Sequence, residues 1–357
     1  MGAMYGPSSP PQWLFSISAL QSTPSRTVSS ISQEKELYDR ARGIEFLFRL
    51  GVSLQLPSSA MYTAATWFHR FYMRYSLEDY HRQDVAASCI FLATKTEECG
   101  RKLRDVAKVV RSKISRVDVN DIPDDSKELE ECQTAILLTE EALLEALCFD
   151  FVVDSPHAEL VDLFDMGQEE LFVEDCAWTI ANDSYRTPLC ILYPPRIIAV
   201  ACYVLAQHLA EGPNSPPLDV RIASPAPSAS LPTPPSHKAP SPRNSRFAIE
   251  HFGFNEMELA SVADVLRIIL EFYAAQDIHH AAEHLSAVAT IPPPKGTANR
   301  DRLYQPISHK VAASQSTTNA SVMPGQTAHI ASEPGSSDTP SPSKPVSRGW
   351  RPIAENT

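Results

Sequence analysis

A lysine and two glutamates at the end of an apolar segment are the residues of this chain best placed to form a site. Lys95, Glu97 and Glu98 follow residues 85–93, nearly all of which are apolar or small. A lysine suits the negative C-terminal end of a helix, whereas two carboxylates there are unfavourable. Residues that break such a rule at the edge of a core often mark a functional site, although a solvated helix end would produce the same pattern.

The apolar segment predicts a helix that other helices enclose, because it has no polar face at a period of 3.6 residues. The long helix that closes this part of the chain carries five apolar residues: Ile136, Leu137, Leu143, Leu144 and Leu147. Five helices predict a first all-α domain over residues 31–152, preceded by an N-terminal arm over residues 1–30. Besides the enclosed one, their predicted ranges are 32–50, 58–75, 102–113 and 127–148.

The pattern then repeats. A second helix that is apolar nearly all round is predicted over residues 194–210, after two amphipathic helices, and this repetition favours a duplicated all-α unit. The second domain is predicted over residues 153–285. Its composition predicts a disordered Pro-rich insertion at 212–245, and the C-terminal tail, 286–357, is predicted to be disordered as well. The other helices predicted in this domain span residues 156–166, 169–186 and 255–276.

The composition argues against several classes of function. With 31 basic and 43 acidic residues, the net charge of −12 disfavours a general nucleic-acid-binding surface. The seven cysteines form no CxxC pair, so we expect core thiols in a reducing compartment, with no metal site. The chain lacks a run of about 18 apolar residues and a secretory signal at its start, so we expect a soluble protein of the cytosol or nucleus without a membrane partner.

One basic face stands out against this acidic background. Arg101, Arg104, Lys108 and Arg111 recur at helical spacing in and just before the helix predicted over residues 102–113. Such a face is either solvated or a contact for an acidic partner surface. An acidic loop, residues 118–125 with the sequence DVNDIPDD, follows it.

Four segments of the chain match a known family. They are WLFS at 13–16 with TPS at 23–25, FHRFYM at 68–73, IFLATKTEE at 90–98, and AWTIANDS at 177–184 followed by YPPRIIAVA at 193–201. In this combination the chain resembles a transcription-type cyclin, of the cyclin K type and of the fungal cyclin subunit of the kinase that phosphorylates the C-terminal domain of RNA polymerase II. The resemblance implies two tandem five-helix cyclin boxes.

The resemblance also implies a function. A cyclin of this kind is not an enzyme but binds and activates a cyclin-dependent kinase in the nucleus. That kinase would phosphorylate the C-terminal domain of RNA polymerase II and promote transcription elongation. The resemblance implies no cofactor and no direct contact with nucleic acid, and a third subunit is compatible with it.

In cyclins, a lysine at the end of the third helix and a glutamate on the fifth face the kinase. In this sequence they correspond to Lys95 and Glu140, the latter counted back from the Cys-Phe-Asp string at 148–150, and the adjacent Glu141 stays open. An ammonium and a carboxylate beside an apolar patch can satisfy polar groups of a partner helix, while the buried area supplies most of the affinity. Three further residues are expected at this kinase-binding site: Glu98, Phe91 and Leu144.

Four serines and threonines in the Pro-rich segments precede a proline, the pattern that proline-directed kinases favour. They are candidate sites for phosphorylation by the partner kinase itself: Ser224, Thr233, Ser241 and Ser341.

Other functions compete with this interpretation. Within the family, the splicing-associated cyclin L type and the Mediator-associated cyclin C type are alternatives. A DNA-binding transcription factor of the TFIIB type shares the duplicated fold, but such factors carry a zinc ribbon and basic repeats. The string HAAEH at 280–284 fits the HxxEH pattern of zinc peptidases, but it has no convincing third ligand in the sequence predicted to fold.

Overall fold

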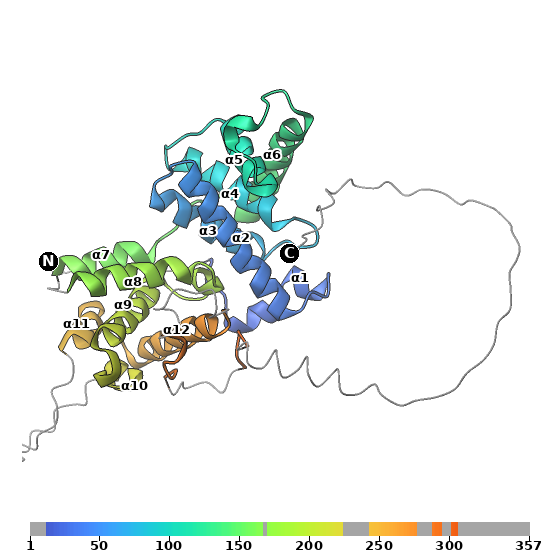
Figure 1. The fold of residues 1–357 in the computed structure, drawn as a ribbon. Helices are drawn as coiled ribbons and strands as arrows, with labels where there is room; N and C mark the ends of the chain where they lie inside the picture. The colour runs from blue at the N-terminus through green and yellow to red at the C-terminus, as the bar shows by residue number, and fades with distance from the viewer. Residues whose placement is uncertain (1–11, 167–169, 224–242, 277–287, 295–300, 306–357) are drawn as a thin grey trace, which may run out of the picture. The chain divides into compact units, whose positions relative to one another are not determined.

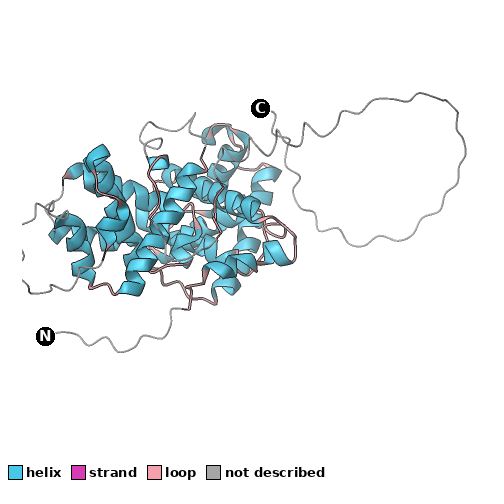
Figure 2. Cartoon of the chain, turned by 90° about the horizontal axis from the view of Figure 1, so that it is seen from below, coloured by secondary structure: helices cyan, strands magenta, loops and turns pink. Residues whose placement is uncertain are grey.

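The computed structural model describes residues 12–166, 170–223, 243–276, 288–294 and 301–305, all within one compact unit of the chain. Within these ranges the regular secondary structure is entirely helical, as Figure 2 shows, and the predicted all-α fold is confirmed. Two short helices open the described part, η1 (Ile17–Gln21) and α1 (Pro24–Thr27).

The first group of helices is built around α4 (Arg82–Thr96), which lies among its neighbours in Figure 1. Every side chain from Val85 to Thr94 is buried, so α4 has no solvent-facing side over this length and other helices must cover it. The helices packed against it are α2 (Gln33–Ser53), α3 (Ser58–Phe71), α5 (Leu103–Ser115) and α6 (Lys127–Leu147).

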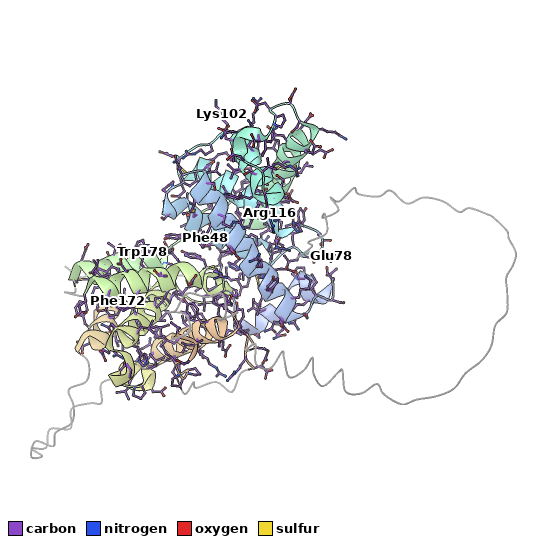
Figure 3. The ribbon with its side chains drawn as sticks, viewed as in Figure 1. Phe48, Glu78, Lys102, Arg116, Phe172 and Trp178 are labelled. Atoms are coloured by element: carbon purple, nitrogen blue, oxygen red, sulfur yellow. The ribbon has the colours of Figure 1, made fainter. Side chains whose placement is uncertain are left out.

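The second group is built in the same way around α9 (Pro195–Glu211), in which all side chains from Ile197 to Gln207 are buried. The helices in contact with it are α7 (Pro156–Met166), α8 (Leu171–Ser184), α10 (Leu218–Ile222), α11 (Arg243–Phe252) and α12 (Glu256–Ala274), together with the short helices η3 (Pro188–Ile191) and η4 (Gly212–Asn214). Figure 3 labels Phe172 and Trp178 on α8.

Polar caps fix where several of these helices begin. The hydroxyl of Ser32 accepts the amide of Lys35 at the start of α2, and that of Ser126 accepts the amide of Leu129 at the start of α6. Helix α12 begins with a capping box in which Asn255 and Glu258 each accept the other's backbone amide. Each such bond satisfies an amide that the helix itself leaves unpaired.

The predicted boundaries of the two disordered segments are too wide. Leu218 and Ile222 of α10 lie inside the range 212–245, and both are buried in the core of the group of helices around α9. Leu303 and Tyr304, inside the range 286–357, are also buried there, and the amide of Leu303 donates to the Glu271 carboxylate at 2.9 Å. A few apolar residues suffice for docking against a core that is already formed, even where the average composition is polar. Residues 224–242 and 306–357 lie outside the described residues, and the predicted division into two domains stays a prediction.

A buried arginine joins α2 to α3. The side chain of Arg40 is fully buried and pairs with Glu36 at 2.8 Å, and its guanidinium donates to the carbonyls of His69 at 3.0 Å and Tyr72 at 2.8 Å. Glu36 also accepts the hydroxyl of Thr23 at 2.7 Å. A buried charge is tolerated only when it is paired and hydrogen-bonded, so this network fixes the N-terminal arm against both helices.

Contacts from α3 link the two groups of helices. His69 is fully buried, and its Nε2 lies 2.8 Å from the carbonyl oxygen of Tyr185. A carbonyl can only accept, so Nε2 carries the proton and donates it. The hydroxyl of Tyr62 donates to Asn182 at 2.7 Å, and the rings of Tyr62 and Tyr185 stack with centroids 5.2 Å apart. This junction therefore holds a neutral histidine and stacked aromatic rings.

Burial, and to a smaller extent the charge of Arg40, lower the pKa of His69 to about 3 from its ordinary 6.5. The unfolded chain therefore takes up a proton below pH 6.5 that the folded chain refuses until about pH 3, and stability falls as the pH decreases through this window. We predict that His69→Gln, which keeps a donor for Tyr185, makes the free energy of unfolding less dependent on pH by about 1.4 kcal/mol per unit between pH 6 and 4. Urea unfolding at several pH values measures this slope. Equal slopes for the two proteins would contradict a neutral buried His69.

Candidate functional site

The candidate site lies where α4 runs alongside α6. The buried hydroxyl of Ser88 donates to the carbonyl of Ile136 at 2.9 Å, which fixes the two helices against each other. Thr94 is the last buried residue of α4, and the helix ends with Glu97 as its C-cap. The side chain of Lys95 is therefore the first to emerge from the core next to α6.

The structure brings Lys95 together with Glu140 rather than with Glu141. The ammonium of Lys95 lies 2.5 Å from Oε1 of Glu140 and 4.3 Å from the centroid of the Phe91 ring. The side chain of Glu140 is only 8% exposed, that of Lys95 is 48% exposed, and Glu141 is exposed. The ion pair thus has one face in the core and the other in solvent, and the aromatic ring adds a cation–π contact to it.

The buried oxygen of Glu140, Oε1, is the one that pairs with Lys95, and their separation of 2.5 Å is short enough for a charge-assisted hydrogen bond. An ammonium carries three donors. The half-exposed Lys95 can therefore also donate to a partner that approaches this edge.

The two glutamates at the end of α4 have separate positions. Glu97 accepts the hydroxyl of Thr63 at 2.9 Å and so fixes the end of α4 to α3. Glu98 is exposed, with a backbone φ of 54°, in the left-handed region. Both glutamates are exposed, but the carboxylate of Glu97 is already bonded to Thr63.

Apolar side chains flank the ion pair on α6. Leu144 is half-buried, one helical turn beyond Glu140. Leu137 is 46% exposed and Leu138 63% exposed, and Leu138, two residues before Glu140, points to the opposite side of α6 from it. A helix turns about 100° per residue, so the consecutive residues 136–138 cannot all face one core, and Ile136 takes the buried position. Leu137, three residues before Glu140, is the exposed apolar side chain on the side of the ion pair, a feature of the site that the sequence analysis missed.

The residues of the basic face do not act as one set. The guanidinium of Arg101 donates to the carbonyls of Leu54, Gln55 and Cys99 at 3.0, 3.0 and 2.7 Å, so Arg101 ties the loop after α2 to the loop before α5. Lys108 pairs with Asp124 of the acidic loop, at 2.5 Å. Arg104 and Arg111 lie on the same face of α5 at helical spacing. The structure therefore removes Arg101 from the predicted face.

The remaining predicted sites fall outside the described residues or have no counterpart in them. Ser224, Thr233, Ser241 and Ser341 lie outside the described residues, as does the HAAEH string. In the part of the chain that the structure describes, no group of His, Cys, Asp or Glu side chains is arranged to hold a metal ion. None of the described helices combines the length and apolar character needed to cross a membrane. All seven cysteines are free.

Comparison with known proteins identifies the family. Residues 13–152 match the family described as "Cyclin, N-terminal domain". Cyclin pch1 of Schizosaccharomyces pombe is 42% identical over 197 residues, which cover 55% of this chain and 57% of the relative. Cyclin-K of Homo sapiens is 33% identical over 206 residues, covering 56% of this chain and 34% of the relative. Residues 13–152 therefore form a cyclin N-terminal domain, and the resemblance of the chain to transcription-type cyclins is confirmed.

A solved structure agrees with this assignment at the level of the fold. A chain of the yeast RNA Pol II CTD kinase CTDK-1 complex superposes with a TM-score of 0.56 at 18% identity, over 87% of this chain and 91% of that one. The described helices therefore have a cyclin fold. As a family, cyclins are non-catalytic regulatory subunits of kinases, which agrees with the prediction that this chain is not an enzyme.

We expect the ion pair to contribute little to folding, because replacing both members of a charge pair by neutral side chains of similar size is often close to neutral even where the pair is buried. We predict that replacing both partners, Lys95→Met with Glu140→Gln, changes the free energy of unfolding by less than about 1 kcal/mol in urea. By contrast, Arg40→Met leaves Glu36 buried without its partner and costs about 3–5 kcal/mol. A loss from the Lys95 and Glu140 double variant as large as that from Arg40→Met would show that the pair serves the fold.

Proposed function

We propose that this chain is the regulatory subunit of a cyclin-dependent kinase and that the kinase binds at Lys95 and Glu140. The observation that carries the proposal is the half-exposed ion pair beside the exposed Leu137 and the half-buried Leu144. A partner helix laid along this edge would bury these two leucines and offer polar groups to the ion pair. Apolar anchors next to a few oriented charges are typical of the centre of a protein interface.

Activation by such a contact is a shift of population. A kinase whose movable helix samples active and inactive positions is activated by a partner that binds the active position more tightly. The cyclin supplies no reacting group. Its contribution is a rigid surface, and α4 provides this because its side chains from Val85 to Thr94 are held in the core. The difference in affinity between the two kinase states sets the limit of activation.

The proposed substrate of the kinase is the C-terminal domain of RNA polymerase II, and the proposed role is transcription elongation in the nucleus. The relationship to Cyclin-K and to pch1 supports a nuclear transcription role. The cyclin C and cyclin L types remain the alternatives within the family. Purification of the tagged chain at moderate salt decides among them. The three types differ in the kinase that would be recovered in near-equal amount and in any third subunit.

Removing the ion pair tests the proposed kinase site directly. We predict that Lys95→Met with Glu140→Gln lowers kinase activation at least about tenfold, since truncation of central interface residues commonly costs more than 1.4 kcal/mol. The measurement is phosphorylation of a C-terminal-domain peptide by the co-expressed kinase.

A matched control is the exposed ion pair of Arg42 and Glu45 on α2, whose side chains are 47% and 36% exposed. Arg42→Met with Glu45→Gln should leave activation unchanged. Full activation by the Lys95 and Glu140 variant, with circular dichroism like that of the parent, would overturn the assignment of the site.

The bound kinase is also proposed to modify the chain itself. We predict phosphate on at least one of Ser224, Thr233, Ser241 and Ser341 after incubation of the complex with ATP, because each precedes proline. Mass spectrometry of the active complex, beside a complex with a catalytically inactive kinase, measures this. Complete absence of phosphate at all four positions would refute phosphorylation of the chain by its own kinase.

A further inference from the structure

The acidic loop folds back along α5 and meets its basic face. Arg116, the C-cap of α5, has a φ of 58°, which reverses the chain. The hydroxyl of Ser112 then donates to the carbonyl of Val117 at 2.7 Å, and seven residues later Asp124 reaches Lys108, one turn nearer the start of the helix. The loop thus runs antiparallel to α5. Figure 3 labels Lys102 and Arg116 at the two ends of this helix.

The two ends of the loop are held differently. Val119 packs against the core of the group of helices around α4, so the beginning of the loop has an apolar anchor. The side chain of Asp124 is 61% exposed and is held by its ion pair with Lys108. The neighbouring Lys108 and, to a smaller extent, Arg104 lower the pKa of the Asp124 carboxyl, so it is ionised at neutral pH. Exposed ion pairs of this kind are weak and are screened by salt.

Basic residues are concentrated in α5 and its C-cap. Residues 103–116 contain five basic residues and one acidic residue, within a chain of net charge −12. Apolar side chains are exposed next to this charge, with Ile114 38% and Val117 43% exposed. Charge together with exposed apolar side chains suits a peptide that has both acidic and apolar residues.

We propose that the face of α5 formed by Arg104 and Lys108 is a docking site for an acidic peptide segment of another protein, and that the end of the acidic loop occupies it as an internal competitor. The seated loop indicates the chemistry of the ligand, since it is itself a peptide with carboxylates beside Ile122 and Pro123. Nucleic acid fits less well because the chain as a whole would repel it. None of these residues belongs to the site at Lys95 and Glu140, so docking at α5 is separate from kinase binding.

The test uses the full chain and a fluorescein-labelled peptide with the loop's own sequence, DVNDIPDD. Fluorescence anisotropy compares the parent with Asp124→Asn combined with Asp125→Asn, which removes the competing charge. We expect the variant to bind the peptide about three- to fivefold more tightly, as an exposed ion pair allows, and to lose affinity as salt increases. Equal affinity of the two proteins would overturn the role of the loop as a competitor.

Two further variants test which cations take part. In the background with the loop neutralised, Arg104→Met with Lys108→Met should abolish the gain. The matched control, Lys127→Met, removes an exposed lysine whose side chain is 83% exposed and should retain it. Loss of the gain in both variants, or tighter binding of an eight-nucleotide single-stranded RNA than of the peptide, would overturn the proposal. Circular dichroism confirms that each variant is folded.

Discussion

The complete burial of α4 is the constraint on which the rest of the structure depends. A helix without a polar side over ten residues is stable only inside a core, so α2, α3, α5 and α6 must surround it. That enclosure also fixes where α4 can leave the core. Lys95 is the first side chain to emerge, and α6 lies next to it with Glu140. The position of the candidate site therefore follows from the packing of the helix that precedes it.

The segments that resemble the cyclin family divide into structural and surface residues. In FHRFYM, His69 donates to the carbonyl of Tyr185, and Arg70 donates to the carbonyl of Val152 at 3.2 Å. The ring of Trp13 lies under the guanidinium of Arg70, at 4.8 Å, and its indole nitrogen donates to Asp150 at 2.8 Å. These residues hold the N-terminal arm and the junction between the two groups of helices. IFLATKTEE differs from the other segments in ending on four consecutive exposed residues, Lys95 to Glu98.

The sequence predicts the enclosed helices well because their pattern is unambiguous. Residues 85–93 and 194–210 are apolar on all sides, and both become the centre of a group of helices. The sequence does not settle the rotation of α6, because three consecutive apolar residues and two consecutive glutamates fit several rotations. Packing selects Ile136 and Glu140 for burial and leaves Leu137, Leu138 and Glu141 exposed. Arg101 is misassigned because it precedes the N-cap of α5 and so lies off the helical face.

The central claim is that a kinase covers the edge of α6 beside the ion pair. The most direct measurement places a photo-crosslinking amino acid at Leu137, with the same group at Val28, which is 77% exposed, as the control position. After irradiation in the native cell, mass spectrometry identifies the attached protein. The account predicts that a cyclin-dependent kinase is attached at position 137 and not at position 28. Attachment of other proteins at position 137, while a kinase is co-purified, would contradict the location of the site. Recovery of promoter factors and no kinase would contradict the function.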